Sequence, residues 1–107
     1  MRGPYPLSPL MVEMHVPCKV RGVFCLAREP HGPIVAVRRA EVDMREELKS
    51  LFGEYRAFWF EGCCGQEEGW VIHCRTFHRA LEAGKLEDPT HPIPAGGAQV
   101  KCVVCGR

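Results

Sequence analysis

The chain has no apolar run approaching the roughly 20 residues that a membrane-spanning helix needs, and its N-terminal residues 1–9 lack the apolar core of a secretory signal. These absences predict a cytoplasmic protein with no membrane partner. An excess of charge of one sign is missing too, because 14 Lys and Arg stand against 13 Asp and Glu, for a net charge of +1. This balance gives no global attraction to nucleic acid.

The cysteine content is high for a cytoplasmic chain, with seven cysteines in 107 residues. An odd number without an export signal favours metal ligation or buried free thiols over disulfides. A single domain of this length buries only a modest core, so a bound metal would add useful stability. Of the seven cysteines, Cys18 and Cys25 are expected to pack in the core. The vicinal Cys63 and Cys64 are expected to lie in a loop.

The spacing of apolar residues predicts an α+β fold. Residues 1–17 contain four prolines and are expected to form an arm that lies over the domain or is partly disordered. Residues 18–107 are expected to form the domain itself, a three-stranded, mainly antiparallel sheet flanked by helices, with an irregular C-terminal tail stapled by zinc. The predicted elements are strands at 19–28 and 34–37, a helix at 43–53, a strand at 55–61 and a helix at 69–84.

The most specific motif is the knuckle Cys102-Val103-Val104-Cys105-Gly106, in which two thiolates separated by two residues can grip one ion. Cys74 and His78 lie four residues apart on the last predicted helix, so their side chains leave one face about a turn apart. The four residues form a closed Cys3His set and predict one structural zinc ion per chain. His91, in the tail, is the alternative to His78 as the fourth ligand.

Two other interpretations of these residues remain open. Cys74 and His78 also lie on the apolar stripe of their helix, where a buried Cys often acts as a small hydrophobe. The pair Cys102 and Cys105 would suit thiol redox chemistry, although redox motifs of this spacing usually open a helix, and none is predicted to follow here.

Three tail segments have a distinctive order: His73-Cys74-Arg75-Thr76-Phe77-His78, then Leu86-Glu87-Asp88-Pro89-Thr90-His91-Pro92, then Cys102-Val103-Val104-Cys105. They resemble the pattern E-C-x-x-Y-H, L-x-N-x-x-H-P, C-P-x-C of one branch of the GIY-YIG endonuclease-like superfamily. The resemblance covers about residues 21–106. It implies a hairpin, a helix, a third strand and another helix, the same order that the apolar spacing predicts.

Active members of that superfamily use a Tyr from each hairpin strand, an Arg on the first helix and a metal-holding Glu on the second. The resemblance places Phe24, Val35, Glu47 and His73 at these positions. It therefore implies a degenerate member that has lost the nuclease reaction, with no catalytic residues.

The leading hypothesis is thus a zinc-stabilised, non-catalytic binding or scaffold domain whose partner is nucleic acid or protein. Arg38 and Arg39 are the candidate nucleic-acid contacts. One alternative is a metal-dependent nuclease with relocated catalytic residues, such as Arg38 beside Glu68. The other is a thiol redox or metal-handling protein.

Overall fold

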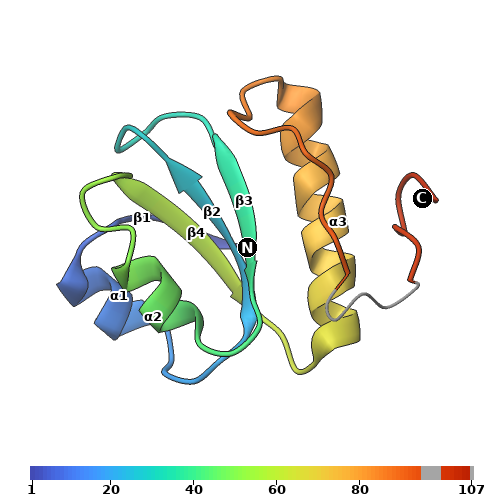
Figure 1. The fold of residues 1–107 in the computed structure, drawn as a ribbon. Coiled ribbons are helices and arrows are strands. Elements are labelled where there is room, and N and C mark those ends of the chain that lie inside the picture. Colours follow the sequence, from blue (N-terminus) through green and yellow to red (C-terminus); the bar gives the residue numbers. More distant parts are fainter. Residues whose placement is uncertain (95–99, 107) are drawn as a thin grey trace.

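The computed structural model describes residues 1–94 and 100–106, and this part of the chain forms an α+β fold (Figure 1). Its four strands form one antiparallel sheet in the order β1-β4-β2-β3. The elements in chain order are β1 (Arg2–Pro6), α1 (Pro9–His15), β2 (Gly22–Ala27), β3 (Ala36–Ala40), α2 (Met44–Lys49), β4 (Ala57–Gly62) and α3 (Gln66–Ala83).

The sheet has one strand more than the sequence predicts, and the extra strand comes from the proline-rich N-terminal arm. Strand β1 pairs with β4 at the edge of the sheet, where a proline's missing N–H leaves no central ladder bond unmade. The ring of Tyr5 packs against Phe58 and Phe60, with centroids 5.6 and 6.1 Å away. The prediction of three strands was wrong because prolines hide the alternation by which strands are recognised.

The N-terminal segment also forms helix α1. The side chain of Ser8 accepts a hydrogen bond from the backbone N–H of Met11, and Pro9 occupies the first turn, which needs no N–H. At the other end, the guanidinium of Arg45 on α2 donates to the carbonyl of Val16 at 2.8 Å. This contact fastens α2 to the end of α1.

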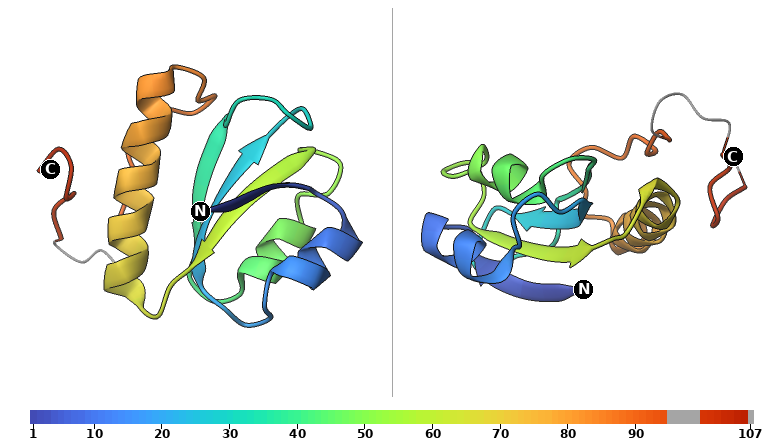
Figure 2. Two further views of the ribbon diagram at one scale, coloured as in Figure 1. Left: turned by 180° about the vertical axis from the view of Figure 1, so that it is seen from behind. Right: turned by 90° about the horizontal axis from the view of Figure 1, so that it is seen from below.

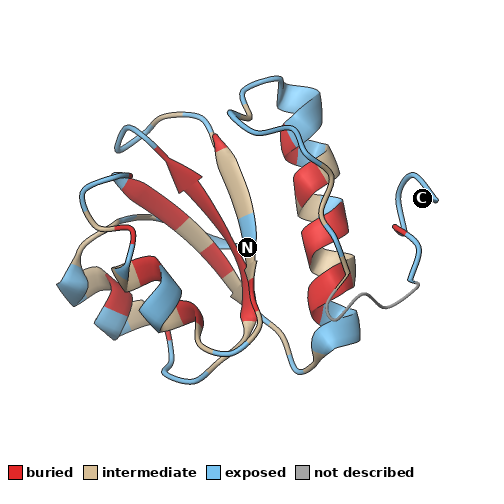
Figure 3. Cartoon of the chain, viewed as in Figure 1, coloured by how far each residue is buried: buried red, intermediate tan, exposed pale blue. Residues whose placement is uncertain are grey.

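Helices α1 and α2 cover one face of the sheet. Their buried residues Val12, Met44 and Leu48 share a core with Phe24 and Phe58 of β2 and β4. Strand β2 lies between β4 and β3 and is buried along its whole length (Figure 3). This central position explains its apolar sequence and the burial of Cys25, which was expected in the core.

Helix α3 lies beside β3, away from α1 and α2 (Figures 1 and 2). It ends at Gly84, whose positive φ of 75° is the left-handed conformation expected of a C-terminal glycine. The chain then turns back, and the N–H of Glu87 donates to the carbonyl of Val35 at 2.9 Å. The tail is thereby attached to the sheet before it reaches the candidate site. Within the described residues, no helix combines the length and apolarity that crossing a membrane requires.

Candidate metal centre

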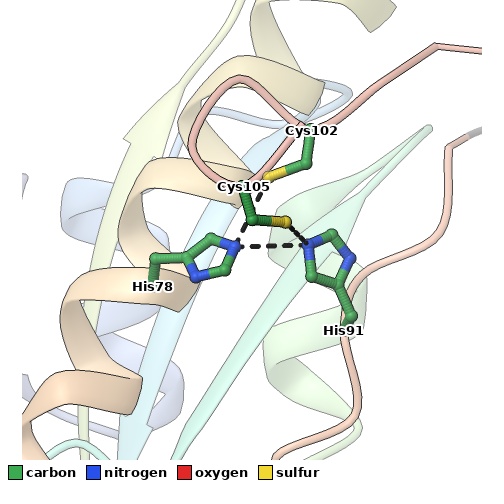
Figure 4. A group of neighbouring side chains, drawn as sticks. All are labelled: His78, His91, Cys102 and Cys105. Atoms are coloured by element: carbon green, nitrogen blue, oxygen red, sulfur yellow. Dashed lines mark hydrogen bonds between the residues drawn. The ribbon is translucent and has the colours of Figure 1, made fainter. Parts of the chain in front are cut away.

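Four side chains converge on one point, one from α3 and three from the tail that follows it: His78, His91, Cys102 and Cys105 (Figure 4). Each offers a ligand atom, and these atoms all lie within 4.8 Å of one another. The two Nε2 atoms of the histidines are 3.2 Å apart. The Sγ of Cys102 lies 3.4 Å from His78 Nε2, and the Sγ of Cys105 lies 3.4 Å from His91 Nε2. The group can hold a metal ion.

Helix α3 positions His78 at the edge of its buried stripe. Trp70, Cys74 and Phe77 on this stripe are buried, whereas His78 is half-buried. The ring of Phe77 meets that of His78 edge-on, with centroids 5.3 Å apart, and also meets the ring of His91 at 5.6 Å. The ring of Phe77 thus contacts both imidazoles and helps to fix their orientation.

The tautomer of His91 suits a ligand. Its Nδ1 lies 2.8 Å from the carbonyl oxygen of Pro92, and because a carbonyl can only accept, Nδ1 carries the ring proton. Nε2 is therefore left with a lone pair that faces the other three groups. Hydrogen bonds of this kind fix the orientation of histidines that bind metals.

The backbone of the knuckle is closed by its own hydrogen bonds. The N–H of Gly106 donates to the carbonyl of Cys102 at 3.0 Å, and the positive φ of 74° at Gly106 is a conformation that favours glycine. The indole N–H of Trp70 donates to the carbonyl of Lys101 at 3.1 Å. Trp70 therefore attaches the knuckle to α3.

The thiol of Cys102 is prepared for the thiolate form. Burial opposes the charge, but backbone hydrogen bonds at Cys105 and Val104, with contributions from the side chains of His91 and Cys74, lower the pKa of Cys102 to about 5. A thiolate is the form that binds metal. The proton stays on Cys74, because burial, and then the hydrogen bond to Cys102, raise the pKa of Cys74 to about 12.

The structure brings together three of the four ligands that the sequence predicts, His78, Cys102 and Cys105, and adds the alternative ligand His91. Cys74 lies outside this group. It is fully buried and packs with Trp70 and Cys102. The i, i+4 spacing predicts that Cys74 and His78 chelate one ion together. Both contact Cys102, but only His78 contributes an atom to the ligand group. One signal for this was available, since Cys74 shares its stripe with Trp70 and Phe77.

Arg39, a candidate nucleic-acid contact, is engaged inside the protein. Its guanidinium donates to the carboxylate of Glu41, to Nδ1 of His73 at 3.1 Å and to the carbonyl of Ile93 at 2.6 Å. The last contact ties β3 to the segment that carries His91. Arg38, the other candidate, is exposed on β3. Sequence reasoning missed the anchoring role of Arg39, because nothing local indicates that Ile93 returns to β3.

Four residues were expected, from the resemblance alone, at the positions of the superfamily's catalytic groups, and each has surroundings unlike those of a nuclease site. Phe24 and Val35 are buried in the core, His73 is buried against Arg39, and Glu47 is exposed on α2. Glu68 accepts a hydrogen bond from the N–H of Cys64 at 3.0 Å, at the start of α3. Its carboxylate thus caps the N-terminus of α3.

The remaining cysteines lie away from the cluster. Cys63 and Cys64 occupy the turn before α3, as expected of a loop, but Cys18 is exposed and not part of the core. Cys18 precedes β2, which begins only at Gly22, so it falls outside the buried strand.

Comparisons of the chain with protein-family models, with curated proteins and with solved structures give no match.

Proposed function

We propose that the chain is a non-catalytic binding or scaffold domain in which one structural zinc ion fastens the C-terminal tail to α3. The observation that carries this proposal is the convergence of His78, His91, Cys102 and Cys105. Two of these ligands come from the knuckle, one from the helix and one from the segment between them. A single ion would therefore tie three stretches of chain together.

The spacing of the ligand atoms suits zinc. A tetrahedral zinc ion with Zn–N of about 2.0–2.1 Å and Zn–S of about 2.3 Å has edges of about 3.3 Å between nitrogens and about 3.6 Å between nitrogen and sulfur. The corresponding distances are 3.2 Å for His78–His91 and 3.4 Å for both Cys–His contacts. The observed distances are shorter than these edges by about 0.1–0.2 Å, so an ion fits between the atoms with little movement.

A structural role follows from the ligand count. Catalytic zinc ions usually keep one position for water, whereas structural sites are closed by four protein ligands. Two thiolates and two imidazoles close this site and also favour zinc over the harder ions magnesium and calcium, which prefer oxygen.

The proposed scaffold is a degenerate GIY-YIG-like fold. The order hairpin β2-β3, helix α2, strand β4 and helix α3 supports it, as do the tail segments that carry His78, His91 and the knuckle. The binding partner would be a protein or a nucleic acid, with Arg38 exposed for contact.

Purified protein is expected to contain one zinc ion per chain, and His91→Ala is expected to lose it. Cys74→Ala, which removes a sulfur that lies outside the ligand group, should retain it. Elemental analysis after dialysis measures the stoichiometry, and cobalt substitution reports the ligands through thiolate-to-metal absorption. Retention of zinc by His91→Ala together with loss from Cys74→Ala would restore the Cys3His assignment.

The protein is expected to show no magnesium- or manganese-dependent nuclease activity. The reaction needs a carboxylate that holds the metal and a cation that offsets charge on the phosphate, and losing one such group typically costs about a hundredfold or more in rate. Labelled single- and double-stranded DNA and RNA serve as substrates. Cleavage that disappears in Glu68→Gln would instead show a nuclease with a relocated active site.

A further inference from the structure

Cys74 is a buried cysteine that lies outside the proposed ligand group but contacts one of its members, Cys102. It is 0% exposed, Cys102 is 3% exposed, and the two pack together with Trp70. Two buried cysteine side chains in contact are the arrangement of a peroxide-sensitive cysteine and its resolving cysteine in redox-sensitive sites.

The contact between the two sulfurs does not depend on the ion alone. Trp70 lies one helical turn before Cys74, and its indole N–H holds the carbonyl of Lys101, the residue before Cys102, at 3.1 Å. The same helix thus carries Cys74 and fastens the backbone that precedes Cys102. This attachment keeps Cys102 beside Cys74 when the ion leaves.

We propose that Cys74 and Cys102 form a reversible disulfide under peroxide and thereby release the metal. The inference rests on the proposed metal site and deepens it by assigning its regulation. A disulfide sulfur has no negative charge to offer an ion, so oxidation removes Cys102 from the ligand set. Three ligands would remain, and a covalent bond between Cys102 and α3 would replace the metal as the attachment of the tail.

The chemistry needs only hydrogen peroxide as oxidant. The thiolate of Cys102 attacks one peroxide oxygen, the O–O bond breaks, and the other oxygen leaves as hydroxide, which gives a sulfenic acid on Cys102. The thiol of Cys74 then attacks this sulfur and loses its proton, and the sulfenic oxygen leaves as water. One S–S bond forms, two electrons pass from the thiols to the peroxide, and the peroxide is reduced to water and hydroxide.

The competing product is a disulfide between Cys102 and Cys105. The sulfur of Cys105 contacts His91 Nε2 at 3.4 Å, and Cys105 is exposed. Cys102 belongs to the same ligand group as Cys105, but its side chain is buried together with Cys74 and packs with it. This geometry favours the bond between tail and helix over the bond within the knuckle.

Peptide mapping distinguishes the two disulfides. After peroxide treatment of the zinc-loaded protein, trypsin is expected to yield residues 57–75 linked to residues 102–107, with the loss of two hydrogen atoms. Because residues 57–75 also contain Cys63 and Cys64, the variant Cys74→Ala is needed to assign the bond and should abolish the cross-link. A disulfide confined to residues 102–107 in the wild type would overturn the inference.

Reversibility gives a second readout. Thiol reductant should restore most of the zinc to oxidised wild-type protein, whereas Cys102 in Cys74→Ala should oxidise further to the sulfinic acid, with recovery of at most about a tenth of the zinc. Cys25→Ala is the matched control, because Cys25 is equally buried but contacts Met1, and it should behave as the wild type. Equal recovery in Cys74→Ala and the wild type would contradict a resolving role.

The two proposals fail in different ways. Protein that never binds zinc would refute the metal site, but the cross-link would still be read by mass in the metal-free chain. Protein that binds one zinc ion per chain and forms no cross-link under peroxide would refute the redox pair alone.

Discussion

Cys102→Ser is expected to lower the free energy of unfolding by about 4 kcal/mol or more, whereas Cys18→Ser should leave it near the wild-type value. Removing a ligand weakens a metal site whose binding free energy is itself part of the folding free energy. Cys102 is 3% exposed and also packs against Trp70 and Cys74, so its loss disturbs a second buried cluster. Cys18 is exposed and belongs neither to the ligand group nor to the buried cluster of Trp70, Cys74 and Cys102.

Denaturant titrations with and without a zinc chelator test this expectation. The chelator should destabilise the wild type and Cys18→Ser to the same degree and should change Cys102→Ser little, because that variant has already lost its tight site. A chelator effect of equal size in all three proteins would show that Cys102 does not hold the stabilising ion. Equal stability of Cys102→Ser and Cys18→Ser would count against the structural role of the site.

The elements that sequence reasoning located best have strong local signals. Asp43 caps α2 through the N–H of Glu46, as its position before an apolar stripe predicts, and Gly84 ends α3. The hairpin and β4 were also predicted, with boundaries a few residues away from those observed. Strand β1 was not, because its identity depends on pairing with β4, more than fifty residues away, and prolines weaken its local pattern.

The individual candidate ligands of the metal centre could be predicted from the sequence, but the final set of four could not. The knuckle and His78 follow from spacing, since both lie within one turn of chain or helix. The sequence left open whether His78 or His91 is the ligand, and the structure places both histidines in the group and Cys74 outside it. The position of His91 depends on the path of the tail, which is held by the contacts of Arg39 with Ile93 and of Glu87 with Val35. No sequence period records such long-range contacts.

His73→Gln is expected to reduce the loss of stability that acid causes. Burial, and then the nearby charge of Arg39, lower the pKa of His73 from 6.5 to about 4. The guanidinium of Arg39 can only donate, so Nδ1 of the neutral ring accepts and Nε2 carries the proton. The carbonyl of Val37 and the carboxylate of Glu41 act in the opposite direction, and His91 adds to the lowering.

The sign follows from the protons bound in each state. Above pH 6.5 the ring is neutral in both the folded and the unfolded chain, and it contributes no pH dependence. Between pH 6.5 and 4 the unfolded chain takes up the proton and the folded chain does not, so the free energy of unfolding decreases as the pH is lowered. The decrease reaches about 3 kcal/mol below pH 4. Glutamine offers a donor and an acceptor in this environment but does not titrate.

The quantity to measure is the difference in unfolding free energy between the wild type and His73→Gln at a series of pH values. Both proteins carry the same proposed metal ligands, so the loss of metal in acid cancels in this difference. The stability of the wild type relative to the variant should decline as the pH falls from 6.5 to 4. His31→Gln, a change at an exposed position in the β2–β3 loop, should follow the wild type. A constant difference between the wild type and His73→Gln would mean that His73 titrates alike in both states and that its burial against Arg39 does not govern the acid response.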